Sequence, residues 1–325
     1  MKQSHPPAIT DILNYARLAP SVHNTQPWSF RVEGMTITLL VNHDRILIDG
    51  DPTKRELWIS LGVCLETLLM ASKALGHTAT IASSQSDSLE EPVATIMISP
   101  QTGPTIPASL HAITKRHSYR GALQPTALPS SLLANCRRAI TGLGGASVWL
   151  IDQPADIESV ADLTYKGMRL ALSSPGFRHE LADLIHYNWS AARTGMHGFV
   201  LNRRTIGSIW EKWSIKLGLD IKQKALADRT KVAAASGLLF VATKGDVPHY
   251  WLTAGRAYAR VCQVITQAGL AQSTIAAPIE AASFHEDVER LLKTPHRIQA
   301  MIRIGKAAHA QKKFSPRLSV DELLT

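Results

Sequence analysis

The phrase KRHSYRG, residues 115–121, places two arginines on either side of a histidine and a serine. Arg116 and Arg120 carry planar guanidinium groups, and each can give a phosphate two charge-assisted hydrogen bonds at once. The residues between them are His117, Ser118 and Tyr119, and the serine adds a short hydroxyl donor. A solvated helix end would present the same residues, so the phrase alone is compatible with a phosphate site and with a charged surface.

The phrase PSVHNTQPW, residues 20–28, contains more hydrogen-bonding groups than a connector needs. Pro20 and Pro27 restrict the backbone at its two ends. The polar side chains between them include Ser21, His23, Asn24 and Gln26. Such side chains can satisfy a flat heterocycle, although Ser and Asn also stabilise turns by bonding to their own backbone. Because the polar groups outnumber those of a simple turn, we expect a rigid binding loop.

The phrase AAPIEAASF, residues 276–284, follows a strand-like segment. Its small alanines would let backbone N–H groups approach a ligand closely, and Glu280 could act as a general base. Alternatively, Glu280 is an acidic residue at the start of the next helix, EDVERLL. Arg317, with Lys312 and Lys313 nearby in sequence, is a further candidate anion contact, although a solvated charged tail would look the same.

Two long apolar segments are expected to form helices of closely similar pattern. The repeated positions are Trp58, Gly62 and Gly76 in the first segment and Trp251, Gly255 and Gly269 in the second. Each member of the second set lies 193 positions after its counterpart. The last glycine of each set is typical of a helix C-terminus, because glycine readily adopts the left-handed conformation. A β-type segment follows each helix.

A second correspondence lies upstream, where ILNYARLAPSVHNTQPWSFRV can be laid on LLANCRRAITGLGGASVWLI. Each reads as a helix, a loop and a strand, but the loops differ: one is PSVHNTQP and the other is TGLGGA. Chance repetition of helix and strand would explain this second match, but it explains the spacing of tryptophans and glycines less well. We therefore interpret the chain as an internal duplication.

The duplication predicts two unequal domains. Residues 1–105 form a first, truncated half and residues 106–325 a second half, separated by a linker rich in Pro, Gly, Ser and Thr at residues 98–110. The second half contains an insert at about residues 165–230 that is rich in Trp, Gly and His. This insert is expected to be a lid over a site or a helical hairpin that fills the surface.

Composition describes a globular chain with a basic surface. The 325 residues are 45% hydrophobic and 19% charged, with a formal net charge of +9 and a pI of about 9.6. The charge favours an anionic partner: nucleic acid, acidic lipid or a phosphorylated small molecule. No nucleic-acid-binding motif is visible, and the three cysteines lack metal-binding or disulfide spacing. No signal peptide or membrane-spanning run is expected, which favours the cytoplasm.

Taken together, the phrases resemble the motifs of the nitroreductase family of flavin enzymes. RHSYR, PSVHNTQPW, PIEA and SPR are similar to its RHSxK/R, PSxxNxQPW, PIEG and terminal basic motifs. In the family, RHS precedes PSxxN within one copy, whereas here the two lie in different halves. Because nitroreductases are intertwined homodimers with FMN at the subunit interface, this arrangement resembles the Acg-like branch, in which one chain contains two nitroreductase-like halves.

The resemblance implies an α+β fold in which two halves form an intramolecular pseudo-dimer. Each half would be a helix-flanked antiparallel sheet, with the helices of Trp58 and Trp251 buried at the pseudo-twofold interface. Each half keeps motifs that the other lacks, so the halves together would complete one FMN site per chain, and the mirror-image site would be lost. The sequence gives no indication for or against a larger assembly of these pseudo-dimers.

The resemblance also assigns roles to residues. Residues that would hold the FMN phosphate and ribityl chain are Arg116, Ser118, Arg120 and Arg317, with His117 contributing through its backbone. Residues that would line the isoalloxazine are Pro20, Ser21, Val22 and Asn24. Backbone groups of Ile279, Glu280 and Ala281 would lie near flavin N5 and O4. Two residues depart from the family pattern: Ala281 replaces a glycine, which would crowd the ring, and Ser315 replaces a basic residue, which shifts phosphate binding toward Lys312 or Lys313.

The implied function is an FMN-dependent oxidoreductase. Hydride would pass from NAD(P)H to FMN and on to an electron-poor small molecule, a nitroaromatic or a quinone, with no indispensable side-chain acid or base. One alternative is an FMN-binding protein whose closed site stores or sequesters the cofactor with little turnover. A second is a basic interaction protein without flavin. Neither a nucleic-acid nor a membrane partner is expected for the enzyme.

Overall fold

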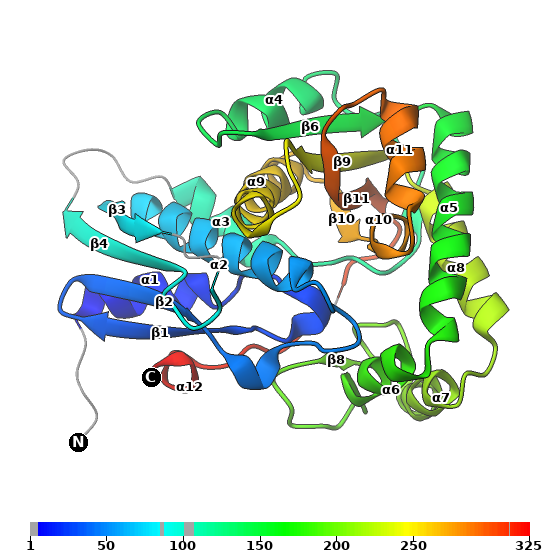
Figure 1. The fold of residues 1–325 in the computed structure, drawn as a ribbon, viewed down its shortest axis with the longest axis horizontal. Coiled ribbons are helices and arrows are strands. Elements are labelled where there is room, and N and C mark those ends of the chain that lie inside the picture. The colour runs from blue at the N-terminus through cyan, green and yellow to red at the C-terminus, as the bar shows by residue number, and fades with distance from the viewer. Residues whose placement is uncertain (1–5, 85–87, 101–106, 312) are drawn as a thin grey trace.

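The computed structural model describes residues 6–84, 88–100, 107–311 and 313–325, and two antiparallel sheets organise this part of the chain (Figure 1). The first sheet contains β1 (Trp28–Glu33), β2 (Thr36–Val41), β3 (His77–Ser84) and β4 (Ala94–Pro100), in the order β1-β2-β4-β3. Helices α1 (Pro7–Ala16) and α2 (Arg55–Ala74) belong to this half, as do the short 3₁₀ helices η1 (Val22–Asn24) and η2 (His43–Arg45). The predicted boundary between residues 105 and 106 lies outside the described residues.

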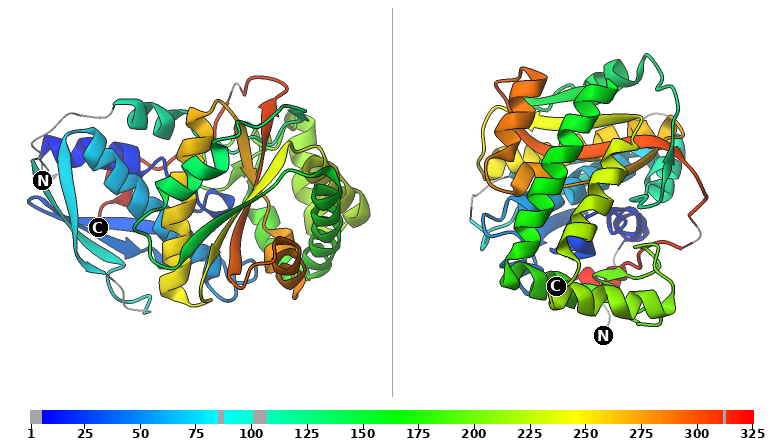
Figure 2. Two further views of the ribbon diagram at one scale, coloured as in Figure 1. Left: turned by 90° about the horizontal axis from the view of Figure 1, so that it is seen from above. Right: turned by 90° about the vertical axis from the view of Figure 1, so that its right-hand side faces the viewer.

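The second sheet contains β6 (Ala146–Ile151), β9 (Gly237–Thr243), β10 (Ala271–Thr274) and β11 (Arg297–Ala307), in the order β10-β11-β9-β6, and β5 (Leu123–Gln124) pairs with the end of β11. Helices α3 (Pro107–Lys115), α4 (Leu132–Ala139) and α9 (Pro248–Gln267) lie toward the first half, while α5 (Pro154–Ser173), α8 (Ile221–Ala233), α10 (Ala277–Glu280) and α11 (Phe284–Leu292) cover the other side (Figures 1 and 2). Every residue of β9 is buried, because helices cover both faces of this central strand. The predicted α+β class with helix-flanked antiparallel sheets is confirmed.

The two sheets share one strand order. If β1, β2, β3 and β4 are matched in sequence with β6, β9, β10 and β11, both sheets read first, second, fourth, third. In each half a 20-residue helix separates the second strand from the third: α2 in one and α9 in the other. Gly76 and Gly269, which follow these helices, have φ of +82° and +72°, as their helix-ending role requires. This arrangement is compatible with the duplication inferred from the sequence.

Helices α2 and α9 cross through a reciprocal glycine contact. A Cβ atom on Gly62 would lie 2.1 Å from the carbonyl oxygen of Leu252, and one on Gly255 would lie 2.0 Å from that of Ile59. Each carbonyl belongs to the residue three positions before the opposing glycine, so the contact is the same in both directions, as at a twofold interface. The glycines therefore allow the two backbones to touch, and one apolar core runs across both halves.

Helix α2 is, within the described residues, long and apolar enough by length and composition alone to cross a membrane, with a mean hydropathy of 1.4. However, 83% of its most apolar stretch is buried inside the protein. Its side chains pack against α9 and the first sheet, so its composition is that of a core helix.

The predicted insert is a long excursion between α5 and α8. It contains α6 (Pro175–Asp183), β7 (Ile185–His186), β8 (Met196–His197) and α7 (Thr205–Lys216), and β7 and β8 pair in parallel. Arg229 of α8 forms ion pairs with Glu158 and Asp162 of α5, which helps to hold the two long helices together. The excursion therefore begins and ends in helices that are anchored on the second sheet.

The C-terminal segment returns to the first half. The N–H of Thr325 donates to the carbonyl of Phe30 at 3.0 Å, and Leu324 forms a parallel bridge with Phe30 in β1. Helix α12 (Val320–Leu323) precedes this bridge and is closed by a capping box between Ser319 and Glu322. This crossing carries Arg317 from the second half to the loop before β1.

Candidate functional site

The loop between α1 and β1 is strained and tightly bonded. His23, Asn24 and Gln26 have φ of 46°, 61° and 52°, which is unusual for residues other than glycine and characteristic of functional sites. The hydroxyl of Ser21 accepts from the N–H of Gln26 at 2.8 Å, and that of Thr25 donates to the carbonyl of Val22 at 3.0 Å. The rigid loop that the sequence predicts is therefore present, and its own side chains hold the strained backbone.

The side-chain amide of Asn24 is fully used by the protein. Its nitrogen donates to the carbonyls of Gly195 at 3.0 Å and Pro316 at 3.1 Å, and its oxygen accepts from Arg317 at 2.5 Å. Gln26 is bonded in the same way: its nitrogen donates to the carbonyl of Arg193 at 2.8 Å. The two amides thus join the loop to the insert and the C-terminal segment, instead of pointing free groups toward a heterocycle.

The insert is also fastened to the first half elsewhere. The carboxylate of Glu180 in α6 accepts from the backbone N–H groups of Ile48 and Gly50, both at 2.6 Å. Arg193 forms an ion pair with Glu322 at 2.5 Å. Because these contacts flank the Asn24 and Gln26 bonds, the insert lies against the loop as a cover.

Three arginines gather where this loop meets the second half. Burial, and after it the neighbouring charges of Arg116 and Arg17, lowers the pKa of Arg317 to about 9. The Nε atoms of Arg17 and Arg317 are buried and have no hydrogen-bond partner in the described part of the chain. Among the described residues, none of the three forms an ion pair with a carboxylate. Arg17 and Arg317 donate to uncharged partners, the Leu318 carbonyl and the Asn24 amide oxygen, so the positive charge of the cluster suits an anion such as a phosphate ester.

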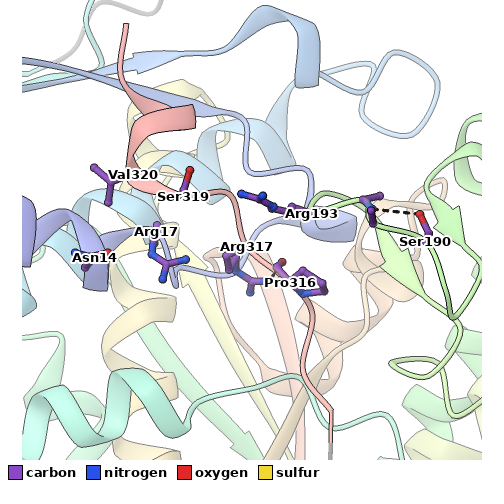
Figure 3. Close-up of a pocket in the computed structure, with 10 residues that line it drawn as sticks. Asn14, Arg17, Ser190, Arg193, Pro316, Arg317, Ser319 and Val320 are labelled. Carbon is purple, nitrogen blue, oxygen red and sulfur yellow. Dashed lines mark hydrogen bonds between the residues drawn. The ribbon is translucent and has the colours of Figure 1, made fainter. Parts of the chain in front are cut away.

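A cavity of about 500 Å³ opens beside this arginine cluster (Figure 3). Arg17 and Arg317 lie side by side on its wall, and Arg193 and Ser190 reach it from the insert (Figure 3). On the side of α9, Pro20 of the first half and Arg116 of the second line one narrow crevice of about 20 Å³. One residue from each of the two phrases thus reaches this crevice, and its other lining residues are uncharged and mostly apolar.

The RHSYR segment is attached to the second sheet. Ser118 forms a parallel bridge with Gln272, and the N–H of Tyr119 donates to the Gln272 carbonyl at 2.8 Å. The guanidinium of Arg120 is buried and contacts the sulfur of Met196 in the insert at 3.4 Å. The ring of His117 packs edge-on against Phe314, with its Nδ1 at 2.9 Å from the Lys115 carbonyl.

The PIEA segment forms the single turn α10, packed against α5. A Cβ on Gly167 would lie 2.3 Å from the Ala277 carbonyl and 3.3 Å from the Ala281 Cβ. The methyl of Ala281 therefore lies against α5, and its φ of −80° needs no glycine. The side chain of Ile279 is buried in the core of the second half. The backbone N–H groups of Ile279 and Glu280 donate to the Ala276 carbonyl at 2.8 and 3.0 Å, and that of Ala281 donates to the Ala277 carbonyl at 3.3 Å. The expectation that these N–H groups point toward flavin N5 and O4 is therefore wrong in this structure, because the turn itself uses them.

Glu280 pairs with an arginine of the other half. Its carboxylate accepts from Arg55 at 3.0 Å, and the same nitrogen bonds Glu56 at 2.8 Å. Burial, followed by the nearby Glu280 charge, raises the pKa of Glu56 well above its ordinary value. The alternative in which Glu280 begins the next helix is wrong, because α11 starts at Phe284 with Ser283 at its N-cap.

His23 lies between these groups. Burial, and after it the charge of Arg120, lowers the pKa of His23 to about 4 against the opposing effect of Glu280 and Glu180. The imidazole is therefore neutral at pH 7, and it faces the RHSYR, PIEA and insert segments at once. Sequence reasoning counted His23 among the polar groups of the binding loop without giving it a role, and it missed Arg17 and Arg55 as site residues. Arg17 precedes the loop directly, but no sequence signal pairs Arg55 with Glu280.

Comparison with known proteins finds a relative named as a nitroreductase. The chain is 26% identical over 325 residues, covering 97% of this chain and 94% of the relative, to a Mycobacterium tuberculosis protein named "Putative NAD(P)H nitroreductase acg". No protein-family model matches. The resemblance to the Acg-like branch, stated from the motifs, is thus confirmed along nearly the whole chain.

Solved structures with similar folds include two nitroreductases. The FMN- and NADPH-dependent nitroreductase NfnB from sphigopyxis sp. strain HMH is 18% identical, with 67% of this chain and 97% of that chain covered and a TM-score of 0.45. The FMN-dependent nitroreductase NfnB from Mycobacterium smegmatis, in complex with NADPH, is 13% identical with the same coverage and a TM-score of 0.44.

Proposed function

We propose that this chain, a full-length homologue of a protein named as an NAD(P)H nitroreductase, is an FMN-dependent oxidoreductase. It would pass hydride from NAD(P)H to an electron-poor small molecule, a nitroaromatic or a quinone, with one FMN per chain. The observation that carries the proposal is the arginine cluster of Arg17, Arg116 and Arg317. Within the described residues it is unpaired with any carboxylate, and it joins two arginines of the second half to the strained loop of the first.

Within this proposal, Arg116 and Arg317 bind the phosphate and Ser118 adds a hydroxyl donor. FMN, when bound, supplies the hydride-transfer chemistry. The loop from Pro20 to Val22 orients the cofactor from the first half. The backbone N–H groups of Glu280 and Ala281 donate within α10 and would reach the cofactor only by exchanging these bonds. Neutral His23 and the insert exclude water from the space between them. Arg120, beside His23, contributes positive charge to the same space.

We also infer that the two halves arose by duplication and form an intramolecular pseudo-dimer, with the division near residue 105. The shared strand order and the reciprocal contact of Gly62 and Gly255 support this inference. A location in the cytoplasm stays a prediction from the sequence.

One observation favours the alternative of a closed FMN-binding protein with little turnover. The insert backbone at Arg193 and Gly195 occupies the amides of Asn24 and Gln26, and Glu180 fastens the insert to residues 48–50. In this state the insert restricts the approach of a nicotinamide, whereas a small reductant could still reach the cofactor.

The test is anaerobic reduction of the purified yellow protein, followed by its flavin absorbance. If NADPH bleaches the flavin and a nitroaromatic restores the colour, the oxidoreductase proposal holds. If only dithionite bleaches it, the closed-site alternative holds. Glu180→Ala then loosens the insert and should permit reduction by NADPH, while Glu158→Ala, on the far contact of α5 with α8, should not. Colourless protein that takes up no added FMN contradicts both proposals and leaves the basic interaction protein.

A further inference from the structure

Helix α7 in the insert has an exposed apolar face. Ile206, Trp210, Trp213 and Leu217 occur at intervals of four, three and four residues, a spacing that places them along one side of a helix. Their exposures are 81%, 57%, 46% and 63%. The helix buries Ser208, Ser214 and Ile215 instead. The tryptophans therefore face solvent while the two serines face the protein, which is the reverse of an ordinary surface helix.

Neighbouring residues enlarge this face. Trp189, in the loop after β7, is 61% exposed, and Ile209 and Leu219 are also exposed. We call Ile206, Ile209, Trp210, Trp213, Leu217 and Leu219 the α7 face. Figure 1 places α7 beside α6 at one end of the molecule, away from both sheets. A gathering of large apolar side chains on one element is typical of a binding surface, whereas scattered exposed residues such as Met97 are ordinary.

Basic residues surround the α7 face. Residues 203–224 contain six Lys or Arg and two Asp or Glu, a formal net charge of +4. The carboxylate of Glu211 is occupied by Arg203 at 2.8 Å and Lys224 at 3.4 Å. Arg204 is exposed at the N-cap of α7 and Lys222 in the first turn of α8, and Lys216 lies 5.9 Å from the Trp213 ring. Lys216 also pairs with Asp183 of α6 at 3.7 Å, so the rim keeps a positive balance with its central acidic group, Glu211, already neutralised.

We propose that the α7 face docks on the surface of an anionic lipid bilayer. Tryptophan and isoleucine on one side of a helix, with lysine and arginine around them, match the interface between acyl chains and anionic headgroups. A 12-residue helix is only about 18 Å long, so it lies in the interface and does not span it. A symmetric contact between two copies of the chain is less favourable, because it would bring two positive rims together.

This inference does not depend on flavin chemistry, and it revises the expectation of no membrane partner. That expectation rested on the lack of a spanning segment, and a peripheral helix needs none. It also accounts for part of the +9 charge through acidic lipid, one of the anionic partners that the charge favours.

The test is co-sedimentation of the protein with two kinds of vesicle at a salt concentration of about 0.15 M. One kind contains phosphatidylcholine alone, and the other also contains about 30% phosphatidylglycerol. We expect binding to the anionic vesicles only, accompanied by a blue shift of tryptophan fluorescence. The double variant Ile206→Ser/Trp210→Ser should weaken this binding by about tenfold or more, and Arg204→Glu/Lys222→Glu by a similar factor. Met97→Ser, an equally exposed residue on β4, is the matched control and should bind as the parent does.

Circular dichroism and the retained flavin content show whether each variant is folded. Equal binding to both vesicle types, or anionic binding that the α7 variants leave unchanged, overturns the proposal. So does concentration-dependent self-association in sedimentation velocity that Trp210→Ser abolishes, without any vesicle binding, since this would identify a second copy of the chain as the partner.

Discussion

The loop at residues 20–27 and the loop at residues 140–145 each connect a helix to the first strand of a sheet, one in each half, yet they are built differently. The first loop reaches positive φ with His23, Asn24 and Gln26, which its own side chains and those of the insert hold in place. The second reaches positive φ with Gly142 and Gly145. Strain without glycine is maintained only where many bonds secure it.

The helices beside these loops show the opposite relation. At the α2–α9 crossing the halves are nearly interchangeable, since each glycine contacts the carbonyl at the corresponding position of the other helix. The comparison teaches that the packing common to both halves is retained, while the polar loop is retained on one side only. One ligand site per chain is the consequence that the following experiments examine.

The largest effect is expected at the shared crossing. Gly62→Ala and Gly255→Ala each place a methyl about 2 Å from a backbone oxygen, within a contact that cannot yield without moving a helix. We expect each to lower the free energy of unfolding by about 3 kcal/mol or more, measured by denaturant unfolding. Gly207→Ala in α7 is the control, because its nearest neighbour would be 3.6 Å away; it should be neutral or slightly stabilising. Tolerance of both crossing variants would contradict the symmetric contact.

The next largest effect is expected in FMN binding, which should depend on the arginine near the polar loop and not on an arginine near the glycine loop. Arg116 forms no side-chain hydrogen bond or ion pair with the described residues, so Arg116→Gln removes little from the fold. It should weaken FMN binding by roughly 30-fold, or about 2 kcal/mol, measured by flavin fluorescence titration. Arg137→Gln is the matched control beside the other loop, where Arg137 donates to the Val148 carbonyl at 3.3 Å. If both variants lose FMN affinity equally, or if the parent chain binds two FMN, the two loops do not differ in ligand binding.

A smaller effect concerns pH. Because the pKa of His23 falls from 6.5 to about 4 in the fold, the unfolded chain binds more protons between these values. Stability therefore declines as the pH is lowered through this window, by about 1–2 kcal/mol between pH 7 and pH 5. Asparagine tolerates positive φ, so His23→Asn should reduce the dependence of the free energy of unfolding on pH in this window. His111→Asn, at an exposed position of α3, should not. An unchanged slope in His23→Asn would exclude this histidine as the cause.

The smallest effect lies in the glycine loop. Gly142→Ala has open space around its new methyl but keeps a φ of +87°, so it should cost about 1 kcal/mol of stability and leave the flavin content unchanged. Gly144→Ala, with equal space and no positive φ, is the control and should remain within about 0.5 kcal/mol of the parent. Loss of flavin in Gly142→Ala would show that this loop also contributes to the site.

Much of the fold could be predicted because its signals are local. The spacing of Trp58, Gly62 and Gly76 marks a helix and its end, and the structure has α2 at Arg55–Ala74 with Gly76 left-handed. The phrase PSVHNTQPW likewise indicated a rigid loop from its prolines and polar residues. The partners of that loop were not predictable, because Asn24 bonds Gly195 and Pro316, which lie 171 and 292 positions away.

The sequence by itself determined the two helices, the glycines that end them, the polar loop and the arginines that a phosphate would need, since these depend on residue type and short spacing. Only the tertiary structure decided that the Asn24 and Gln26 amides are taken by the insert, that Glu280 pairs with Arg55, and that Arg17 joins Arg116 and Arg317. The reason is physical. Hydrogen bonds and charge interactions depend on distances in space. Residues far apart in the sequence come within these distances only when the insert and the C-terminal segment fold back onto the first half.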